Sequence, residues 1–200
     1  MLEAKSLIFR YQPATPLLEG INLTIHPGEI VGLPGASGCG KSTFGRLLAG
    51  YLSPQGGKVL YENSPLPNSG YCPVQMVFQH PEASMNPRWK IKKILTEGNQ
   101  DYTAQLQQFG IHSSWLERYP HELSGGELQR IALTRVMTNN TRYLIADEIT
   151  ASLDPNTQAL IWQNLIPWIK TNQIGLLAIS HDENLLARIS DRLVHTFATQ

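Results

Sequence analysis

The segment Gly35-Ala36-Ser37-Gly38-Cys39-Gly40-Lys41-Ser42 decides the fold of this chain. It fits the pattern G-x-x-x-x-G-K-[ST] at every fixed position, between an expected strand at Glu29–Leu33 and an expected helix at Lys41–Ala49. Glycines let consecutive backbone N–H groups point at phosphate oxygens, at the positive end of the following helix. The alternative is a glycine-rich turn without a ligand, and the flanking strand and helix argue against it. The segment therefore predicts a phosphate-binding loop.

Two side chains at the end of this loop carry its chemistry. Lys41 supplies a mobile positive charge for the β and γ phosphates, and Ser42 supplies a hydroxyl ligand for Mg²⁺. A cysteine at a variable position of the pattern, such as Cys39, is more often incidental than redox-active. We expect the following residues to contact the nucleotide: Gly35, Ala36, Ser37, Gly38, Cys39, Gly40, Lys41, Ser42 and Thr43.

A second motif places two acids at the end of an apolar strand, Tyr143-Leu144-Ile145-Ala146-Asp147-Glu148. The carboxyl ends of the strands line the ligand crevice in open α/β sheets. We expect Asp147 to hold Mg²⁺, directly or through water, and Glu148 to polarise the attacking water as general base. Two solvated acids are the alternative, and the phosphate loop upstream disfavours it because nucleotide sites need such an acid.

Strands and helices alternate over most of the chain, which predicts an α/β fold with a mostly parallel sheet. Leu2–Phe9 and Ile21–Ile25 are expected as N-terminal antiparallel strands. A helical stretch over 80–135, with two short helices between Lys92 and Arg118, interrupts the alternation. We expect a single domain over 1–200, in which 1–79 and 136–200 form the core and 80–135 an inserted helical subdomain. Near the end, Pro167 is expected to end or kink a helix that starts at Pro155.

Composition excludes several classes of protein. Lys plus Arg and Asp plus Glu number 16 each, so the chain lacks the basic field of a typical nucleic-acid binder, and we expect no nucleic-acid partner. No stretch reaches the roughly 18 apolar residues of a membrane span. Charged residues make up only 16%, below the roughly 25% of an average domain, so partners are expected to cover part of the surface.

Besides the phosphate loop and the two acids, the sequence contains four further motifs. They are Gln79, Leu123-Ser124-Gly125-Gly126-Glu127, Ser152-Leu153-Asp154 and His181. In this order and spacing, the chain resembles the ATP-binding subunit of ATP-binding-cassette (ABC) transporters from about Leu2 to Val194. The resemblance implies a P-loop ATPase fold, with ATP and Mg²⁺ as cofactors. Ile149 departs from the family, which usually has proline there, and this substitution is expected to loosen the following turn.

The resemblance also implies roles for single residues. Tyr11 would stack on adenine, although an ordinary strand-end tyrosine is the alternative. Gln79 would contact Mg²⁺ and the attacking water and sense the membrane partner. His181 would contact the γ-phosphate, and Asp154 would communicate between two subunits.

The signature loop is the most specific part of the resemblance. Ser124, Gly125 and Gly126 would close over the γ-phosphate of a facing subunit, because two glycines allow a close backbone approach to an anion. The implied partners are a second ATP-binding subunit, identical or paralogous, two transmembrane permease subunits and, indirectly, an extracytoplasmic solute-binding protein. The implied location is peripheral, on the cytoplasmic face of the membrane.

Two segments indicate a branch of the family. Gln79–Arg88 and Tyr119–Leu123 are similar to peptide and nickel importers, which implies uptake of nickel, metal chelates or small peptides. Three alternatives stay open: a cassette that moves no cargo, a regulatory cassette that only binds ATP, and an exporter cassette. The absence of a second cassette and of a basic surface disfavours the first, and the intact acids and Lys41 disfavour the second.

Overall fold

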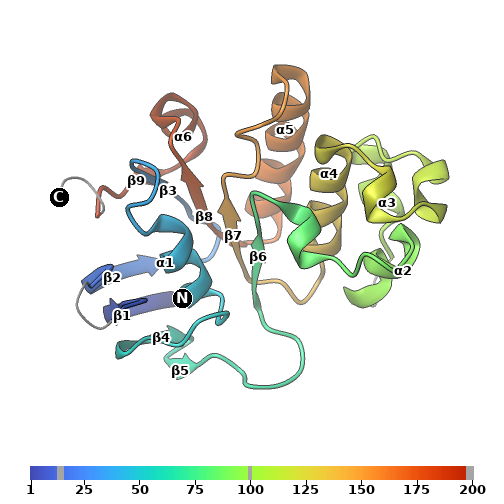
Figure 1. Cartoon of the computed structure of the whole chain (residues 1–200). Helices are drawn as coiled ribbons and strands as arrows, with labels where there is room; N and C mark the ends of the chain where they lie inside the picture. Colours follow the sequence, from blue (N-terminus) through green and yellow to red (C-terminus); the bar gives the residue numbers. More distant parts are fainter. Residues whose placement is uncertain (13–15, 99–100, 197–200) are drawn as a thin grey trace.

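The computed structural model describes residues 1–12, 16–98 and 101–196. Within these ranges the chain forms two sheets (Figure 1). The parallel sheet has the strand order β6-β7-β8-β3-β9. Its strands are β3 (Ile30–Pro34), β6 (Val74–Val77), β7 (Tyr143–Asp147), β8 (Gly175–Ser180) and β9 (Arg192–Leu193). The predicted α/β class is confirmed.

The second sheet is antiparallel and has the order β2-β1-β4-β5. Its strands are β1 (Leu2–Phe9), β2 (Leu18–Ile25), β4 (Gly56–Tyr61) and β5 (Ser64–Pro65). The prediction of N-terminal antiparallel strands is therefore confirmed. Strand β2 starts earlier than expected, because buried Leu18 pairs with Phe9 and extends the ladder.

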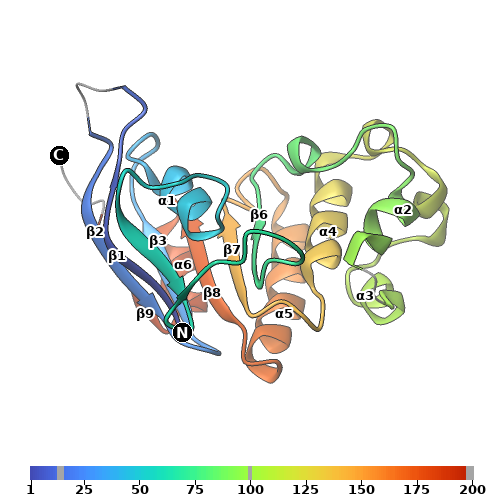
Figure 2. The ribbon, with the colours of Figure 1, turned by 90° about the horizontal axis from the view of Figure 1, so that it is seen from below.

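Between β6 and β7 the described chain forms only helices, which gather beyond β6 at the side far from the antiparallel sheet (Figures 1 and 2). They are η1 (Pro81–Ser84), α2 (Ile91–Leu95), η2 (Thr96–Gly98), α3 (Thr103–Gln108), η3 (Ser113–Glu117), η4 (Pro120–Glu122) and α4 (Gly125–Val136), where η marks a 3₁₀-helix. The two helices expected between Lys92 and Arg118 are thus broken into shorter pieces. The subdomain boundaries at 80 and 135 stay a prediction.

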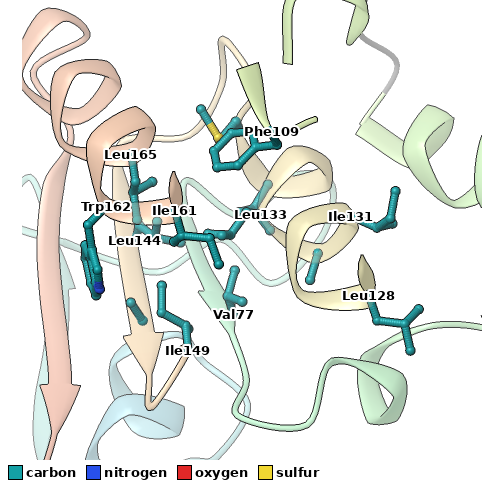
Figure 3. Packing of buried hydrophobic residues seen from close by; sticks show 14 of the residues in the cluster. Val77, Phe109, Leu128, Ile131, Leu133, Leu144, Ile149, Ile161, Trp162 and Leu165 are labelled. Atoms are coloured by element: carbon teal, nitrogen blue, oxygen red, sulfur yellow. The ribbon is translucent and has the colours of Figure 1, made fainter. Parts of the chain in front are cut away.

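Each face of the parallel sheet buries its own hydrophobic cluster, because successive side chains of a strand point to opposite faces. Ile145 and Leu177 pack toward α1 (Lys41–Leu48) and the antiparallel sheet. Leu144 lies on the other face, against α4 and α5 (Pro155–Thr171). Figure 3 shows this second cluster, where Leu133 of α4 lies near Leu144 and Ile161. Covering both faces in this way is typical of parallel sheets.

Of the two expectations for Pro167, that it ends its helix or kinks it, the first is wrong and the second stays a prediction. Helix α5 continues to Thr171, and α6 (Glu183–Ile189) follows after β8. Proline removes one backbone donor, but here both Pro167 and Gln163, whose carbonyl loses its partner, are exposed. Leu165 and Ile169 are fully buried on either side of the proline. Apolar packing against the sheet therefore holds the last turn in place.

Candidate active site

The glycine-rich loop joins β3 to α1, and three of its glycines, Gly35, Gly38 and Gly40, have backbone angles that other residues rarely adopt. Gly38 has a φ of 84° and Gly40 a φ of 106°, both in the left-handed region that favours glycine. A β-carbon on Gly40 would also lie 3.1 Å from Leu18 Cδ2 and 3.2 Å from Leu17 Cγ. The loop can therefore take this path, with the N-terminus of α1 at its end, only because glycine occupies these positions.

Lys41 is the first residue of α1 and is 6% exposed. Its Nζ donates to the carbonyl oxygens of Gly35, at 2.7 Å, and Ala36, at 2.8 Å. The Cys39 sulfur lies 4.0 Å from the same Nζ. The ammonium group is thus held over the loop, where a phosphate group could replace the carbonyl oxygens as its partner.

Ser42 and Asp147 come together from α1 and β7. The Ser42 hydroxyl donates to Asp147 Oδ1 at 3.0 Å. Asp147 is 4% exposed, and this burial raises the pKa of its carboxyl above the usual value, although the Ser42 hydrogen bond acts in the opposite direction. Mg²⁺ prefers oxygen ligands and is usually held by one or two carboxylates plus substrate phosphates. The two oxygens therefore fit the expected magnesium site.

Glu148 follows at the end of β7 and faces His181 from the end of β8. Its carboxylate oxygens lie 3.0 and 3.1 Å from His181 Nδ1. The backbone of Glu148 has a φ of 51°, and its N–H donates to the carbonyl of Ile179 at 3.0 Å. A left-handed glutamate is uncommon, and such strained positions cluster at functional sites. The turn aims the carboxylate out of the sheet, toward His181.

These side chains surround one cavity of about 450 Å³. Its lining consists of Tyr11, Leu17, Ser37, Gly38, Gly40, Lys41, Ser42, Thr43, Gln79, Glu148 and His181. The structure therefore brings together residues from the loop, three strand ends and the N-terminal sheet that the sequence had predicted separately. Leu17 was missed, because a leucine outside any motif gives no sequence signal.

Tyr11 lines this cavity and is 61% exposed. Its hydroxyl lies 3.2 Å from Thr43 Oγ1, and its ring packs edge-on against Phe9, with centroids 4.9 Å apart. A largely exposed aromatic face beside a phosphate site is suited to stacking on a flat ring.

Comparison with known proteins identifies the family. The family model for ABC transporters matches residues 18–151. The chain belongs to this family. It is 38% identical to the nickel import system ATP-binding protein NikE of Staphylococcus aureus, over 97% of this chain and 85% of that protein. It is 35% identical to the oligopeptide transport ATP-binding protein AppF of Bacillus subtilis, over 88% of this chain and 60% of that protein.

Solved structures agree with this assignment. CbiO1 from Clostridium perfringens, part of an ABC transporter complex, is 25% identical, with a TM-score of 0.78 over 98% of this chain and 85% of that chain. A bacterial ABC transporter cassette solved as a dimer superposes with a TM-score of 0.84 at 23% identity, over 98% of this chain and 94% of that chain. The chain is therefore an ABC ATPase, whose ATP hydrolysis is coupled to transport. Among the residues that the structure describes, no helix combines the length and apolar character needed to cross a bilayer.

The signature loop of this ABC cassette lies apart from the cavity. Ser124 caps α4, accepting from the Glu127 N–H at 3.4 Å, while Glu127 Oε2 accepts from the Ser124 N–H at 2.7 Å. Ser124 and Gly125 are exposed. Within the described ranges, neither they nor Gly126 line the cavity. Gly35, Ala36, Cys39 and Asp147 are also outside the lining, but each contacts Lys41 or Ser42, which line it. The signature loop is therefore the part of the predicted site that the described chain leaves apart.

The turn after the two acids is well bonded, although Ile149 was expected to loosen it. Ile149 is 3% exposed and belongs to the core. The Thr150 hydroxyl accepts from Trp162 Nε1 at 3.3 Å and from Gln158 Nε2 at 3.2 Å. Further along, Asp154 caps α5, accepting the backbone N–H groups of Asn156 and Thr157 through Oδ1. Hydrogen bonds from the Thr157 side chain and from these backbone groups lower the pKa of the Asp154 carboxyl.

Proposed function

We propose that this cassette binds the phosphates of ATP in the described cavity and hydrolyses ATP with Glu148 as the general base. The observation that carries the proposal is that Lys41, Ser42 and the Glu148–His181 pair all line one cavity. Asp147 lies directly behind this lining, hydrogen-bonded to the Ser42 hydroxyl. Positioning and charge stabilisation account for most of the catalysis of phosphoryl transfer, and this arrangement supplies both.

Each residue has a defined task in this mechanism. Lys41 exchanges its two loop carbonyls for phosphate oxygens, and Ser42 and Asp147 would hold Mg²⁺. When bound, the ion neutralises charge on the β and γ phosphates. Glu148 accepts the proton of the attacking water, and His181 orients its carboxylate while its outer ring nitrogen faces the γ-phosphate. Gln79 lines the same cavity and positions the water.

The exposed signature loop supports a two-chain mechanism. We propose that Ser124, Gly125 and Gly126 close over the nucleotide of a second cassette, identical or paralogous. The exposed N-terminus of α4, with two glycines in its first turn, offers backbone N–H groups to an anion outside its own chain. Two such cassettes would each complete the site of the other.

The transported substrate is proposed from the relatives. Their names describe nickel import and oligopeptide transport, so we propose that the chain powers import of nickel, metal chelates or small peptides. It would do so through two permease subunits, supplied by an extracytoplasmic solute-binding protein, from the cytoplasmic face of the membrane. Uptake of nickel and of short peptides by cells that lack this chain tests the proposal, and normal uptake of both contradicts it.

The test of the mechanism replaces the base. In Glu148→Gln, we expect ATP turnover to fall about 10²- to 10³-fold, because the amide cannot accept the proton. ATP binding should persist, since the phosphate loop is unchanged. Equilibrium binding and phosphate release measure the two effects separately. Glu183→Gln is the matched control, because Glu183 is an exposed acid in the first turn of α6; wild-type turnover in Glu148→Gln would refute the assignment.

A further inference from the structure

Helix α4 is hydrogen-bonded at two points to the segment that carries Gln79. Gln129 Nε2 donates to the carbonyl of Phe78 at 3.3 Å. Arg135 donates to the carbonyl of Ser84 through Nη1, at 2.7 Å, and to the Ser84 hydroxyl through Nη2, at 3.1 Å. Gln79 therefore lies on a stretch of chain whose two ends are both bonded to one helix.

The Arg135 contact is the stronger of the two attachments. Its side chain is only 15% exposed, and Nη1 also lies 3.5 Å from Glu97 Oε2. Ser84 is fixed in turn, because its hydroxyl donates to the Pro81 carbonyl at 2.9 Å. The planar guanidinium bonds two acceptors of one residue at once, a geometry that a lysine ammonium cannot reproduce.

The helix that makes these bonds also carries the signature loop. Ser124 caps α4, and Arg135 lies in its last turn. Gln129 and Arg135 are six residues apart, or about 9 Å along the axis. A rigid helix bonded at two such points holds the Gln79 segment in one orientation, and a movement of that segment relative to α4 has to break a charge-assisted hydrogen bond.

We propose that Arg135 is a positioning residue for ATP hydrolysis, which acts through Gln79. By holding Ser84, it fixes the path of the chain from β6 to η1 and so the place of the Gln79 side chain in the cavity. Because the signature loop lies at the other end of α4, Arg135 also links the position of Gln79 to the position of that loop. The proposal rests on the proposed role of Gln79 in the site.

A double-mutant cycle separates positioning from a merely structural role. We expect Arg135→Gln and Gln79→Ala each to lower the turnover number about tenfold, with ATP affinity unchanged, since neither alters the phosphate loop. The double variant should be no slower than Gln79→Ala alone, because Arg135 acts through Gln79. Arg135→Lys keeps the positive charge on a single nitrogen, so its turnover should lie between that of Arg135→Gln and that of the wild type.

The outcomes distinguish the two proposals. If the losses multiply, Arg135 does not act through Gln79 and the inference is overturned, while the role of Gln79 stands. If Gln79→Ala turns over ATP at the wild-type rate, the proposed role of Gln79 fails and the inference fails with it.

A second measurement does not depend on activity. Amide hydrogen exchange over residues 79–84 should be faster in Arg135→Lys and, more weakly, in Ser84→Ala. Arg142→Lys is the matched control, since Arg142 donates to the Asn139 carbonyl at 2.7 Å and lies beyond the end of α4. Exchange in Arg135→Lys equal to that of the control overturns the proposal.

Discussion

The phosphate loop and the signature loop are both glycine-containing segments in front of a helix, yet they differ in what surrounds them. Lys41 is 6% exposed and already bonded to two loop carbonyls. Ser124 and Gly125 are exposed, and the Ser124 hydroxyl bonds within the first turn of its own helix. The lysine of the first loop is therefore enclosed by its own chain, whereas the second loop is open to solvent, which is what the proposed two-chain mechanism requires.

The largest expected effect is a loss of ATP affinity when the phosphate loop loses its lysine. Lys41→Ala should lower ATP affinity roughly 10- to 100-fold, because a charge-assisted hydrogen bond to phosphate is lost. Isothermal titration or fluorescent-nucleotide binding measures the change. Lys58→Ala, at an exposed lysine of β4, should bind ATP normally. Equal affinity in the two variants would mean that the loop does not hold the phosphates.

Gly125→Ala tests the signature loop. A β-carbon at Gly125 meets no atom within 4 Å in the described chain, so the free energy of unfolding should change by no more than about 0.5 kcal/mol. Turnover should nevertheless fall about tenfold or more, because the methyl group obstructs a close approach from outside the chain. Unfolding curves and phosphate release, both recorded over a range of protein concentrations, test this. Unchanged turnover would remove the main argument for a facing subunit.

Asp147→Asn should increase the stability of the folded chain at neutral pH, although it removes a proposed ligand of Mg²⁺. Burial raises the pKa of Asp147 in the folded state. The wild-type protein therefore loses stability as the pH rises through that pKa, because the folded state disfavours the charged form. The amide carries no such charge. Without divalent metal, the variant should melt at a higher temperature than the wild type near pH 7, and the difference should shrink toward about pH 4; a constant difference would contradict the burial argument.

The smallest effect concerns the turn that follows the acids. Trp162→Phe removes the indole donor to Thr150 Oγ1, so the folded state should lose about 1 kcal/mol. The melting temperature should fall by about 2–4 °C, with turnover nearly unchanged, because the side chain does not line the cavity. A large loss of turnover would show that the turn, rather than Glu148 alone, controls the site.

Sequence reasoning could propose site residues because their motifs have fixed spacing and a physical role for each position. The structure has the following predicted residues in the lining of one cavity: Tyr11, Ser37, Gly38, Gly40, Lys41, Ser42, Thr43, Gln79, Glu148 and His181. Sequence reasoning also placed both acids at the end of a strand, and the structure has Asp147 and Glu148 at the end of β7. It could not predict the left-handed backbone of Glu148, because that angle depends on the bond to Ile179 in the neighbouring strand. Nor could it predict that α5 passes Pro167, since the compensation comes from packing against the sheet.

One hydrophobic cluster runs without interruption from the parallel sheet through α4 to α2. Val77 and Leu144 of the sheet share it with Leu133 of α4 and Ile91 of α2. A chimera that exchanges only the helical stretch with a relative would therefore join two halves of one core that evolved separately. Such a graft should succeed only if the sheet positions facing α4 are exchanged along with it.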